Sequence, residues 1–499
     1  MQTTDRYTLY TNEQIRKIES AAYELSEFSP QKLMEEAGKV AFEFMMSNWQ
    51  NVKKILIITG SGNNGGDGYV LAKYAKLAGI EVTILQVGLP GNSKEAKAAV
   101  LECQKLKIPI LEKQLDHIFT EFDVIIDAML GIGIKGKKLK PDIKDAIQFI
   151  NKLNKPVLAL DCPSGINTDT GKVIETAISA TKTITFIGLK RGLFTGDARD
   201  YCGEVICHDL SLPAEIFDIA KSYIHSYSIN FLKLFLPKRS KTAYKNNNGH
   251  VLIIGGNFGF PGAVKLAALG ALRSGAGLVS VATQIGNSNG IIAGNPEIMV
   301  HEIKNKDDLL PLLEKATVIV LGPGLGQDSW AEGLFTAVIT TNKPLIIDAD
   351  GLNLLAQKQA SLNIKKRSNW ILTPHPGEAA RLLTTTVAEI ENNRFLAIEK
   401  LYDKYGSNIV LKGAGSLIID SDREIRICNY GNPGMASGGM GDLLTGVISA
   451  LVAQGVDLKK ATIIGTYIHS YAADLASMQF GKIGLLASDL LPFIRQVMN

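Results

Sequence analysis

Twice along this chain of 499 residues, short apolar runs alternate with glycine-rich turns and with segments of helical pattern. The runs are rich in Ile, Leu and Val and too short for helices, which predicts buried strands. Strands that alternate with helices form parallel sheets covered by helices. We therefore predict an α/β protein with two domains, residues 1–225 and 226–499, because the pattern loosens near residue 225 before a new series begins.

The first series contains a strand–turn–helix–strand unit. Two amphipathic helices are expected within residues 12–48, followed by a strand at 54–59, the loop GSGNNGGDG, a helix ending near 79 and a strand at 81–87. A glycine loop in this place binds phosphates in doubly wound sheets, but the spacing is not that of an ordinary dinucleotide-binding turn. Asn63, Asn64 and Asp67 add oxygen donors, which suit a hard cation or a sugar hydroxyl. The alternative is that they only form the turn.

Two acids close apolar runs further along. Strands are expected at 123–128, 156–161, 182–188 and 204–209, and Asp127 and Asp161 end the first two. Since the carboxyl ends of parallel strands share one edge, Asn64, Asp127, Asp161 and Ser164 should meet there. The lysines of the segment 135–140 are either a solvated loop or phosphate contacts.

The second series predicts another sheet of the same kind. Strands are expected at 250–254, 316–322, 344–350, 370–375 and 408–413, and each stops at a polar or glycine cluster. His375 lies between two prolines at one strand end, so we expect a substrate contact. Lys412 ends another strand and is a candidate phosphate partner.

The stretch NPGMASGGMGDLLTG, residues 432–446, follows a strand pattern at 423–430 and leads into an apolar helix. Glycines expose backbone N–H groups, and the start of a helix adds positive potential, so such a loop can hold phosphate. A Walker loop would have Lys where Asp442 stands. A carboxylate there can accept a proton from a hydroxyl that attacks a phosphoryl group. The alternative is a turn with a capping Asp.

The amino-acid composition limits the classes of protein to which this chain can belong. Hydrophobic residues make up 46% and charged residues 20%, as in globular proteins, and a net charge of +4 permits anionic small molecules but is no nucleic-acid footprint. Five cysteines without a CxxC pair predict reduced thiols. With no leader pattern and no apolar run of spanning length, we expect a cytoplasmic protein without membrane contact. No histidine pair has zinc-ligand spacing.

The motifs together resemble the NAD(P)H-hydrate repair enzymes. GSGNNGGDG, DAMLGIGIKG and DCPSG are similar to their epimerase domain, and LRSGAGLVSVAT, GPGLG, DADGLN, HPGE and NPGMASGGMGD to their dehydratase domain. The resemblance covers nearly the whole chain in order, so the chain looks like the bifunctional form. It implies a Rossmann-like three-layer sandwich at the N-terminus and a ribokinase-like α/β domain at the C-terminus.

The resemblance also implies an activity. The first domain would interconvert the R and S hydrates of NADH and NADPH (NADHX and NADPHX) with a bound potassium ion. The second would use ADP and magnesium to dehydrate the S hydrate, giving NAD(P)H, AMP and phosphate. We expect these small molecules as partners, with no nucleic acid, and a homo-oligomer.

Site residues carried over from the family fall into four groups. Asp161 and Asp442 would be catalytic, and Asn64, Asp127 and Ser164 would bind potassium. The hydrate would contact, in the epimerase, Asn63, Asn64, Gly65, Gly66, Asp67, Gly131, Ile132, Gly133, Ile134, Lys135, Gly136, Lys137 and Asp161, and in the dehydratase Ala263, Gly326, His375 and Asp442. ADP would contact Lys412, Gly413, Ala414, Gly415, Ser416, Gly438, Gly439 and Gly441.

Two other functions remain open. One is a ribokinase-like kinase of a small alcohol, which shares the glycine loop and Asp442 but releases a stable phosphorylated product. In the other, the N-terminal domain is a binding module without catalysis. The intact set Asn64, Asp127, Asp161 and Ser164 argues against the second.

Overall fold

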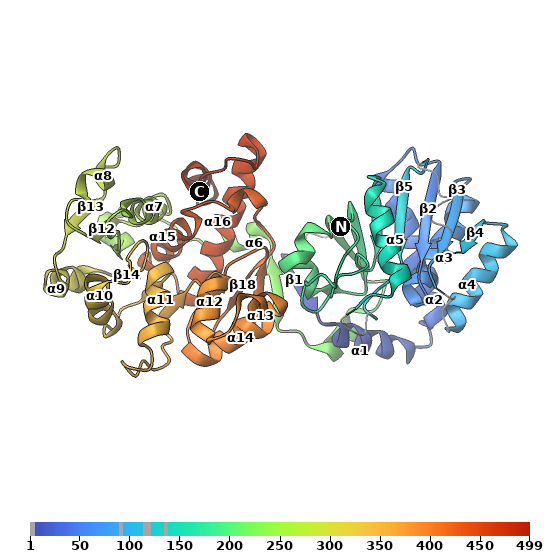
Figure 1. The fold of residues 1–499 in the computed structure, drawn as a ribbon, viewed down its shortest axis with the longest axis horizontal. Helices are drawn as coiled ribbons and strands as arrows, with labels where there is room; N and C mark the ends of the chain where they lie inside the picture. The colour runs from blue at the N-terminus through green and yellow to red at the C-terminus, as the bar shows by residue number, and fades with distance from the viewer. Residues whose placement is uncertain (1–4, 89–92, 113–120, 134–137) are drawn as a thin grey trace. The chain divides into compact units, whose positions relative to one another are not determined.

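A computed structural model describes residues 5–88, 93–112, 121–133 and 138–499 (Figure 1). Contacts divide the chain into two compact units, one of residues 8–224 and one of residues 1–7 and 225–499. Four of the residues named for hydrate binding, Ile134 to Lys137, lie outside the described residues.

The first unit is built on a seven-stranded sheet in the order β4-β3-β2-β5-β6-β7-β9, and every pairing in it is parallel. The order reverses between β2 and β5, and in such sheets ligands bind outside the carboxyl ends of the strands at that point. The strands are β2 (Lys54–Thr59), β3 (Glu81–Gln86), β4 (Ile110–Glu112), β5 (Val124–Ala128), β6 (Val157–Leu160), β7 (Lys182–Phe186) and β9 (Glu204–His208).

Helices cover both faces of this sheet (Figure 1). Ile55 and Ile57 of β2 pack into a core with α2, α3 and α4, while Leu56 and Ile58 pack with α5 on the other face. This alternation follows from the two-residue period of a strand and gives the predicted three layers. The helices are α1 (Asn12–Tyr23), α2 (Pro30–Asn48), α3 (Asn63–Leu77), α4 (Lys94–Lys105) and α5 (Pro141–Lys152).

Short elements complete the unit. They are β8 (Leu189–Lys190) and the 3-10 helices η2 (Arg191–Phe194), η3 (Gly196–Asp200) and η4 (Ala214–Ala220). Strand β1 (Arg6–Tyr10) crosses the boundary between the units, and its residues Leu9 and Tyr10 pair in parallel with β8.

The segment GSGNNGGDG is not the loop that the sequence predicted. Helix α3 begins at Asn63, so Asn64 and Asp67 lie in its first two turns. Its glycines allow a very close approach to the strand ends: a Cβ atom on Gly65 would lie 2.2 Å from the carbonyl oxygen of Gly60. Close packing, and not a wide turn, is the reason for these glycines.

The second unit contains the strand order β13-β12-β11-β14-β15-β16-β17-β18-β19. Pairings are parallel from β13 to β17 and antiparallel between β17, β18 and β19. The strands are β11 (His250–Ile254), β12 (Leu278–Thr283), β13 (Met299–Glu302), β14 (Val318–Leu321), β15 (Leu345–Ile347), β16 (Trp370–Leu372), β17 (Asn408–Leu411), β18 (Ser416–Ile419) and β19 (Ile425–Cys428), with β10 (Ile224–Tyr227) where the chain enters this unit.

The core of this unit fills both faces of the sheet. Val251 and Ile253 pack with α7, α15, α16 and α17, and the alternate residues Leu252 and Ile254 are fully buried too. The helices are α6 (Ile229–Lys233), α7 (Pro261–Arg273), α8 (Ser288–Ile292), α9 (Lys306–Lys315), α10 (Ser329–Ile339), α11 (Ala349–Lys358), α12 (Pro376–Leu383), α13 (Val387–Asn392), α14 (Arg394–Tyr405), α15 (Met440–Ala453), α16 (Leu458–Phe480) and α17 (Leu490–Val497), and the 3-10 helices are η5 (Lys245–Asn248), η6 (Pro433–Met435) and η7 (Ala487–Asp489).

Within the described parts of the chain, no helix combines the length and the apolar character needed to cross a membrane.

Candidate active sites in the two units

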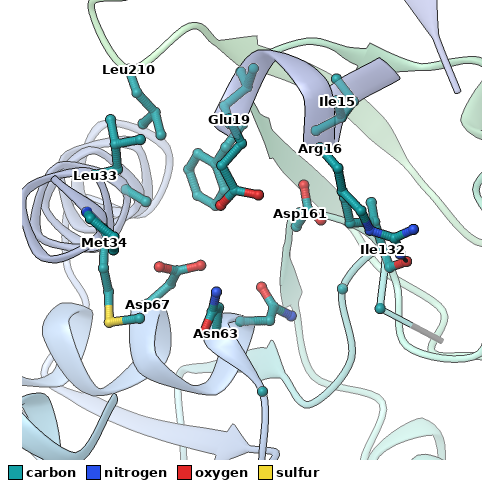
Figure 2. A pocket seen from close by; sticks show the side chains of 18 of the residues that line it. Ile15, Arg16, Glu19, Leu33, Met34, Asn63, Asp67, Ile132, Asp161 and Leu210 are labelled. Atoms are coloured by element: carbon teal, nitrogen blue, oxygen red, sulfur yellow. Dashed lines mark hydrogen bonds between the residues drawn. The ribbon is translucent and has the colours of Figure 1, made fainter. Parts of the chain in front are cut away.

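The first unit has a cavity of about 380 Å³ at the carboxyl edge of its sheet (Figure 2). Its wall is formed by α1, α2, the start of α3, the segment after β5 and the ends of β6 and β7. The polar lining consists of Arg16, Glu19, Tyr23, Ser61, Asn63, Asn64, Asp67, Asp161 and Lys190. Three of these are carboxyl groups from three different elements, and Figure 2 shows all three turned toward the open centre.

Asp161 is tied to a buried lysine. The ammonium group of Lys190 lies 2.5 Å from Oδ1 of Asp161 and also donates to Oγ1 of Thr185 at 2.8 Å and to the carbonyl oxygen of Phe186 at 2.7 Å. Only 1% of the lysine side chain is exposed, against 13% of the aspartate. The ion pair and the further hydrogen bonds of the lysine hold both side chains in place. Asp161 also has φ of +63°, a left-handed conformation of the kind found at functional sites.

Asp127 lies beneath the cavity edge with a different set of partners. Its oxygens accept hydrogen bonds from Oγ of Ser164 at 2.7 Å, from the backbone N of Ser164 at 2.7 Å and from the backbone N of Met129 at 3.2 Å. Burial raises its pKa to about 6, although these hydrogen bonds oppose the rise. Among the described residues no cation is paired with it, so the negative charge lacks compensation.

Asn64 borders the same cavity. Its side chain is buried, and neither its amide oxygen nor its amide nitrogen has a hydrogen-bond partner in the described chain. Buried amides are almost always bonded, so an orphaned one points to an absent ligand. An amide oxygen, a hydroxyl and an uncompensated carboxylate are suitable donors for a hard cation. The residues therefore fit a bound potassium ion.

In the second unit the ends of β15, β16 and β17 bring three ionisable groups together. The ammonium group of Lys412 lies 2.6 Å from Oδ1 of Asp348 and 3.7 Å from Oε2 of Glu378. Both carboxylates are buried. Burial lowers the pKa of Lys412, but the two carboxylates outweigh this and raise it, so the lysine stays charged.

The glycine loop packs directly over this cluster. A Cβ atom on Gly441 would lie 3.1 Å from Nζ of Lys412 and 3.3 Å from Oδ2 of Asp348. Asp442 is the next residue, in the first turn of α15. Burial raises its pKa to about 7, helped by Asp348 and Glu378 and opposed by Lys412. Asp442 is therefore poised to accept a proton near neutral pH.

The other candidate residues of this unit lie on neighbouring strand ends. His375 caps α12: its Nδ1 accepts from the backbone N of Gly377 at 2.9 Å, and its Nε2 lies 3.4 Å from Oε1 of Glu378. Burial lowers its pKa, so the ring is neutral. Gly326 has φ of +74° and donates its N–H to Oδ2 of Asp350 at 2.8 Å. Ala263 lies in the first turn of α7.

Comparison with known proteins shows which family the chain belongs to. Residues 251–496 match the family model described as NAD(P)H-hydrate dehydratase, and residues 30–192 match that of the YjeF-related protein N-terminus. A bifunctional NAD(P)H-hydrate repair enzyme of Coxiella burnetii is 45% identical over 98% of this chain and 99% of its own length. The chain belongs to the family of bifunctional NAD(P)H-hydrate repair enzymes.

Two further similarities support this membership. The Escherichia coli repair enzyme is 39% identical over 99% of this chain and 94% of its own length. A ribokinase-like superfamily protein of Enterococcus faecalis, 30% identical, superposes with a TM-score of 0.50 over 56% of this chain and 96% of its own. The ribokinase-like fold expected for the second half is thereby confirmed.

Sequence reasoning about this repair enzyme missed the partners of its candidate residues. Lys190 follows the two-residue strand β8, and the pattern GLKRG gave no reason to connect it with Asp161. Asp348 stands in the motif DADGLN, and Glu378 in HPGE, but neither was named for a role. A signal was available for Asp348, because an acid directly after a strand lies at the binding edge. Glu378 lies in the first turn of α12, six residues after β16, and had no such signal.

Proposed function

We propose that this chain repairs hydrated NADH and NADPH in two steps, one in each unit. Residues 1–225 would interconvert the R and S hydrates, and residues 226–499 would dehydrate the S hydrate with ADP, giving NAD(P)H, AMP and phosphate. The observation that carries the proposal is Asp442: a half-buried carboxyl with a pKa near neutrality, directly after a glycine loop at the start of a helix.

In the dehydratase, Asp442 removes the proton of the hydrate's hydroxyl as its oxygen attacks the terminal phosphoryl group of ADP. AMP leaves, and the C–O bond of the phosphate ester then breaks to release phosphate. The adjacent carbon gives up a proton to water, which forms the C=C bond of NAD(P)H. We assign hydrate contacts to Ala263, Gly326, His375 and Asp442. Backbone N–H groups of a glycine loop at a helix start suit phosphate oxygens, so we assign ADP to Gly438, Gly439, Gly441 and the segment 412–416.

Magnesium would enter with the nucleotide. No cluster of three or more His, Cys, Asp or Glu side chains among the described residues could hold a metal ion. Magnesium is usually bound through substrate phosphates and water, with few protein ligands. Its charge would neutralise the phosphates near Asp348 and Asp442.

In the epimerase, Asn64, Asp127 and Ser164 would hold potassium, whose charge would compensate Asp127. The hydrate would lie in the cavity against Asn63, Asp67 and Gly131 to Gly133, with Asp161 as a catalytic acid or base. We also propose a cytoplasmic location, in keeping with five free cysteines.

The test uses the purified full-length protein with R hydrate alone, S hydrate alone and a mixture, each with ADP, magnesium and potassium. We expect the absorbance of reduced nicotinamide to return completely in all three, and faster from R hydrate than spontaneous epimerisation allows. A matched Asp161→Asn variant should still convert S hydrate but should convert R hydrate only at the spontaneous rate.

Other outcomes would change the proposal. Recovery of the absorbance with ATP but not with ADP would show that ATP is the nucleotide used. Wild-type protein that does not accelerate the epimerisation of R hydrate would leave the first unit as a binding module. A stable phosphorylated product without reduced nicotinamide would favour the kinase.

A further inference from the structure

The three carboxyl groups of the cavity in the first unit differ in their partners. Asp161 is paired with Lys190, and Glu19 accepts a hydrogen bond from the hydroxyl of Tyr23 at 2.7 Å. Asp67 has no ion pair or side-chain hydrogen bond with any described residue, and its side chain points into the cavity beside Asn63 (Figure 2). One carboxyl group therefore faces the substrate space without a partner.

The surroundings of Asp67 disfavour its charged form. Burial raises its pKa well above the usual range, and the negative charges of Asp161, directly after β6, and Glu19 on α1 add to the rise. Lys190 opposes it, but that ammonium group is already bonded to Asp161. The start of α3 also favours an anion, yet Asp67 is the fifth residue of that helix and the effect fades beyond the first turn.

Arg16 is the remaining charged group of the lining. Its guanidinium group donates to the carbonyl oxygen of Ile132 at 2.8 Å and is exposed at the rim. It therefore does not serve as a counter-ion inside the cavity. Asp67 and Asp161 consequently differ in environment: burial and neighbouring carboxylates disfavour the charged form of Asp67, whereas Asp161 is paired with Lys190. Two carboxyl groups whose environments separate them in this way commonly divide the roles of acid and base.

We propose that Asp67 is the proton donor of the epimerase reaction and that Asp161, paired with Lys190, is the proton acceptor. This inference rests on the epimerase function proposed for the first unit. It gives Asp67 a catalytic role beyond contact with the hydrate, and it makes Lys190 a positioning residue.

Water adds to an enamine at the carbon bonded to the ring nitrogen, because the nitrogen lone pair stabilises positive charge there. Asp67 gives its proton to the hydroxyl, the C–O bond breaks, water leaves with the bonding pair, and the lone pair forms a C=N bond. A water molecule then adds to the opposite face while Asp161 takes its proton. The proton returns from Asp161 to Asp67 through cavity water, which restores the initial state.

The test measures conversion of R to S hydrate without ADP, so that the dehydratase is silent, in water enriched in oxygen-18. The wild type should incorporate the heavy oxygen as it epimerises. Asp67→Asn should lower epimerisation and oxygen exchange together by about 10²–10⁴-fold, the usual contribution of a general acid. Asp67→Glu, which restores a carboxyl group, should recover part of both.

The pH profile gives a second readout that does not depend on the folding of that variant. Wild-type epimerisation should fall at high pH as Asp67 loses its proton. Glu19→Gln removes one negative charge near Asp67 and should move this fall to lower pH. A structural role for Asp67 would not produce such a shift.

Each outcome has one meaning. Wild-type protein that fails to epimerise sinks the proposed function itself. Wild-type protein that epimerises while Asp67→Asn is equally active, or epimerises without oxygen exchange, overturns only the role of Asp67. An unchanged high-pH fall in Glu19→Gln would also overturn it.

Discussion

At the scale of single residues, burial and neighbouring charge decide what each carboxyl group can do. Asp442 and Glu378 both have pKa values raised to about 7, chiefly by burial. The charges of Asp348 and Glu378 add to the rise in the pKa of Asp442, and Lys412 opposes it. A base with a pKa near the working pH is the most effective kind. The cluster therefore tunes Asp442.

The first prediction concerns this base. Asp442 must be ionised to accept a proton, so ADP-dependent dehydration of S hydrate should be low below pH 7, rise through about 7 and level off above it. Asp442→Asn should lower the plateau by about 10²–10⁴-fold and remove the rise. Initial rates across a pH series would measure both.

Glu378→Gln is the matched control for that experiment. Because the charge of Glu378 raises the pKa of Asp442, its removal should move the rise to lower pH. A rise that stays in place would show that another group controls the profile. Epimerisation, measured on the same samples without ADP, should be the same in Asp442→Asn as in the wild type.

At the scale of elements, one helix crossing sets the position of Asp442. α15 packs against α7 at two glycines that face each other. A Cβ atom on Gly446 would lie 2.1 Å from the carbonyl oxygen of Ala267, and one on Gly270 would lie 2.6 Å from that of Leu443. Only glycine permits backbones to approach so closely. Since Asp442 is in the first turn of α15, this crossing holds the base in place.

The second prediction compares two glycine substitutions in helices of the same unit. Gly446→Ala should lower the free energy of unfolding by about 1–3 kcal/mol, as overpacking does, and should lower dehydratase activity because α15 must shift. Gly333→Ala in α10, where a Cβ atom would meet nothing within 4 Å, should raise the free energy of unfolding by about 0.4–1 kcal/mol.

Denaturant unfolding and dehydratase rates of the two variants would measure the difference. Equal effects of both substitutions would contradict a special role for the α7–α15 crossing.

At the scale of the whole molecule, the two candidate sites lie in separate compact units. Their residues share no element, and the donors assigned to potassium, Asn64, Asp127 and Ser164, lie in the first unit. Each activity should therefore respond to its own cofactor and its own substitutions. The dehydratase also offers an internal control for every change made in the epimerase.

The third prediction uses this separation. Replacement of potassium by a smaller monovalent cation should lower the epimerisation of R hydrate and leave the dehydration of S hydrate unchanged. The physical reason is that Asn64, Asp127 and Ser164 would hold the ion beside Asp161 and far in sequence from the glycine loop. Parallel assays in potassium, sodium and lithium salts of equal ionic strength would measure it. An equal loss of both activities would contradict the assignment.

Most of the fold was predictable from local pattern. β2 and β11 have the predicted bounds. Most other predicted strands are shorter than predicted by one to three residues at an end. Many of them end before the polar or glycine residues that the prediction had included, because those residues already belong to the turn. β18 was missed, as were the strands β1, β4, β8, β10, β12 and β13. The segment after Lys412 forms an antiparallel hairpin, although every earlier strand of the second unit leads to a helix. The start of α3 was also missed, because a run of glycines normally argues against a helix.

The sequence by itself determined where strands end and which side chains stand there, since both depend on a few consecutive residues. Asp127 and Asp161 were found in this way, and Asp442 was found from the glycine-rich stretch that leads into its helix. Only the tertiary structure decided their chemical states. Lys190 meets Asp161, and Lys412 meets Asp348 and Glu378, through the order of strands in the sheets, and Asp67 is left without a partner by the same packing. Burial and long-range charge set a proton's position, and neither is written in any short stretch of the chain.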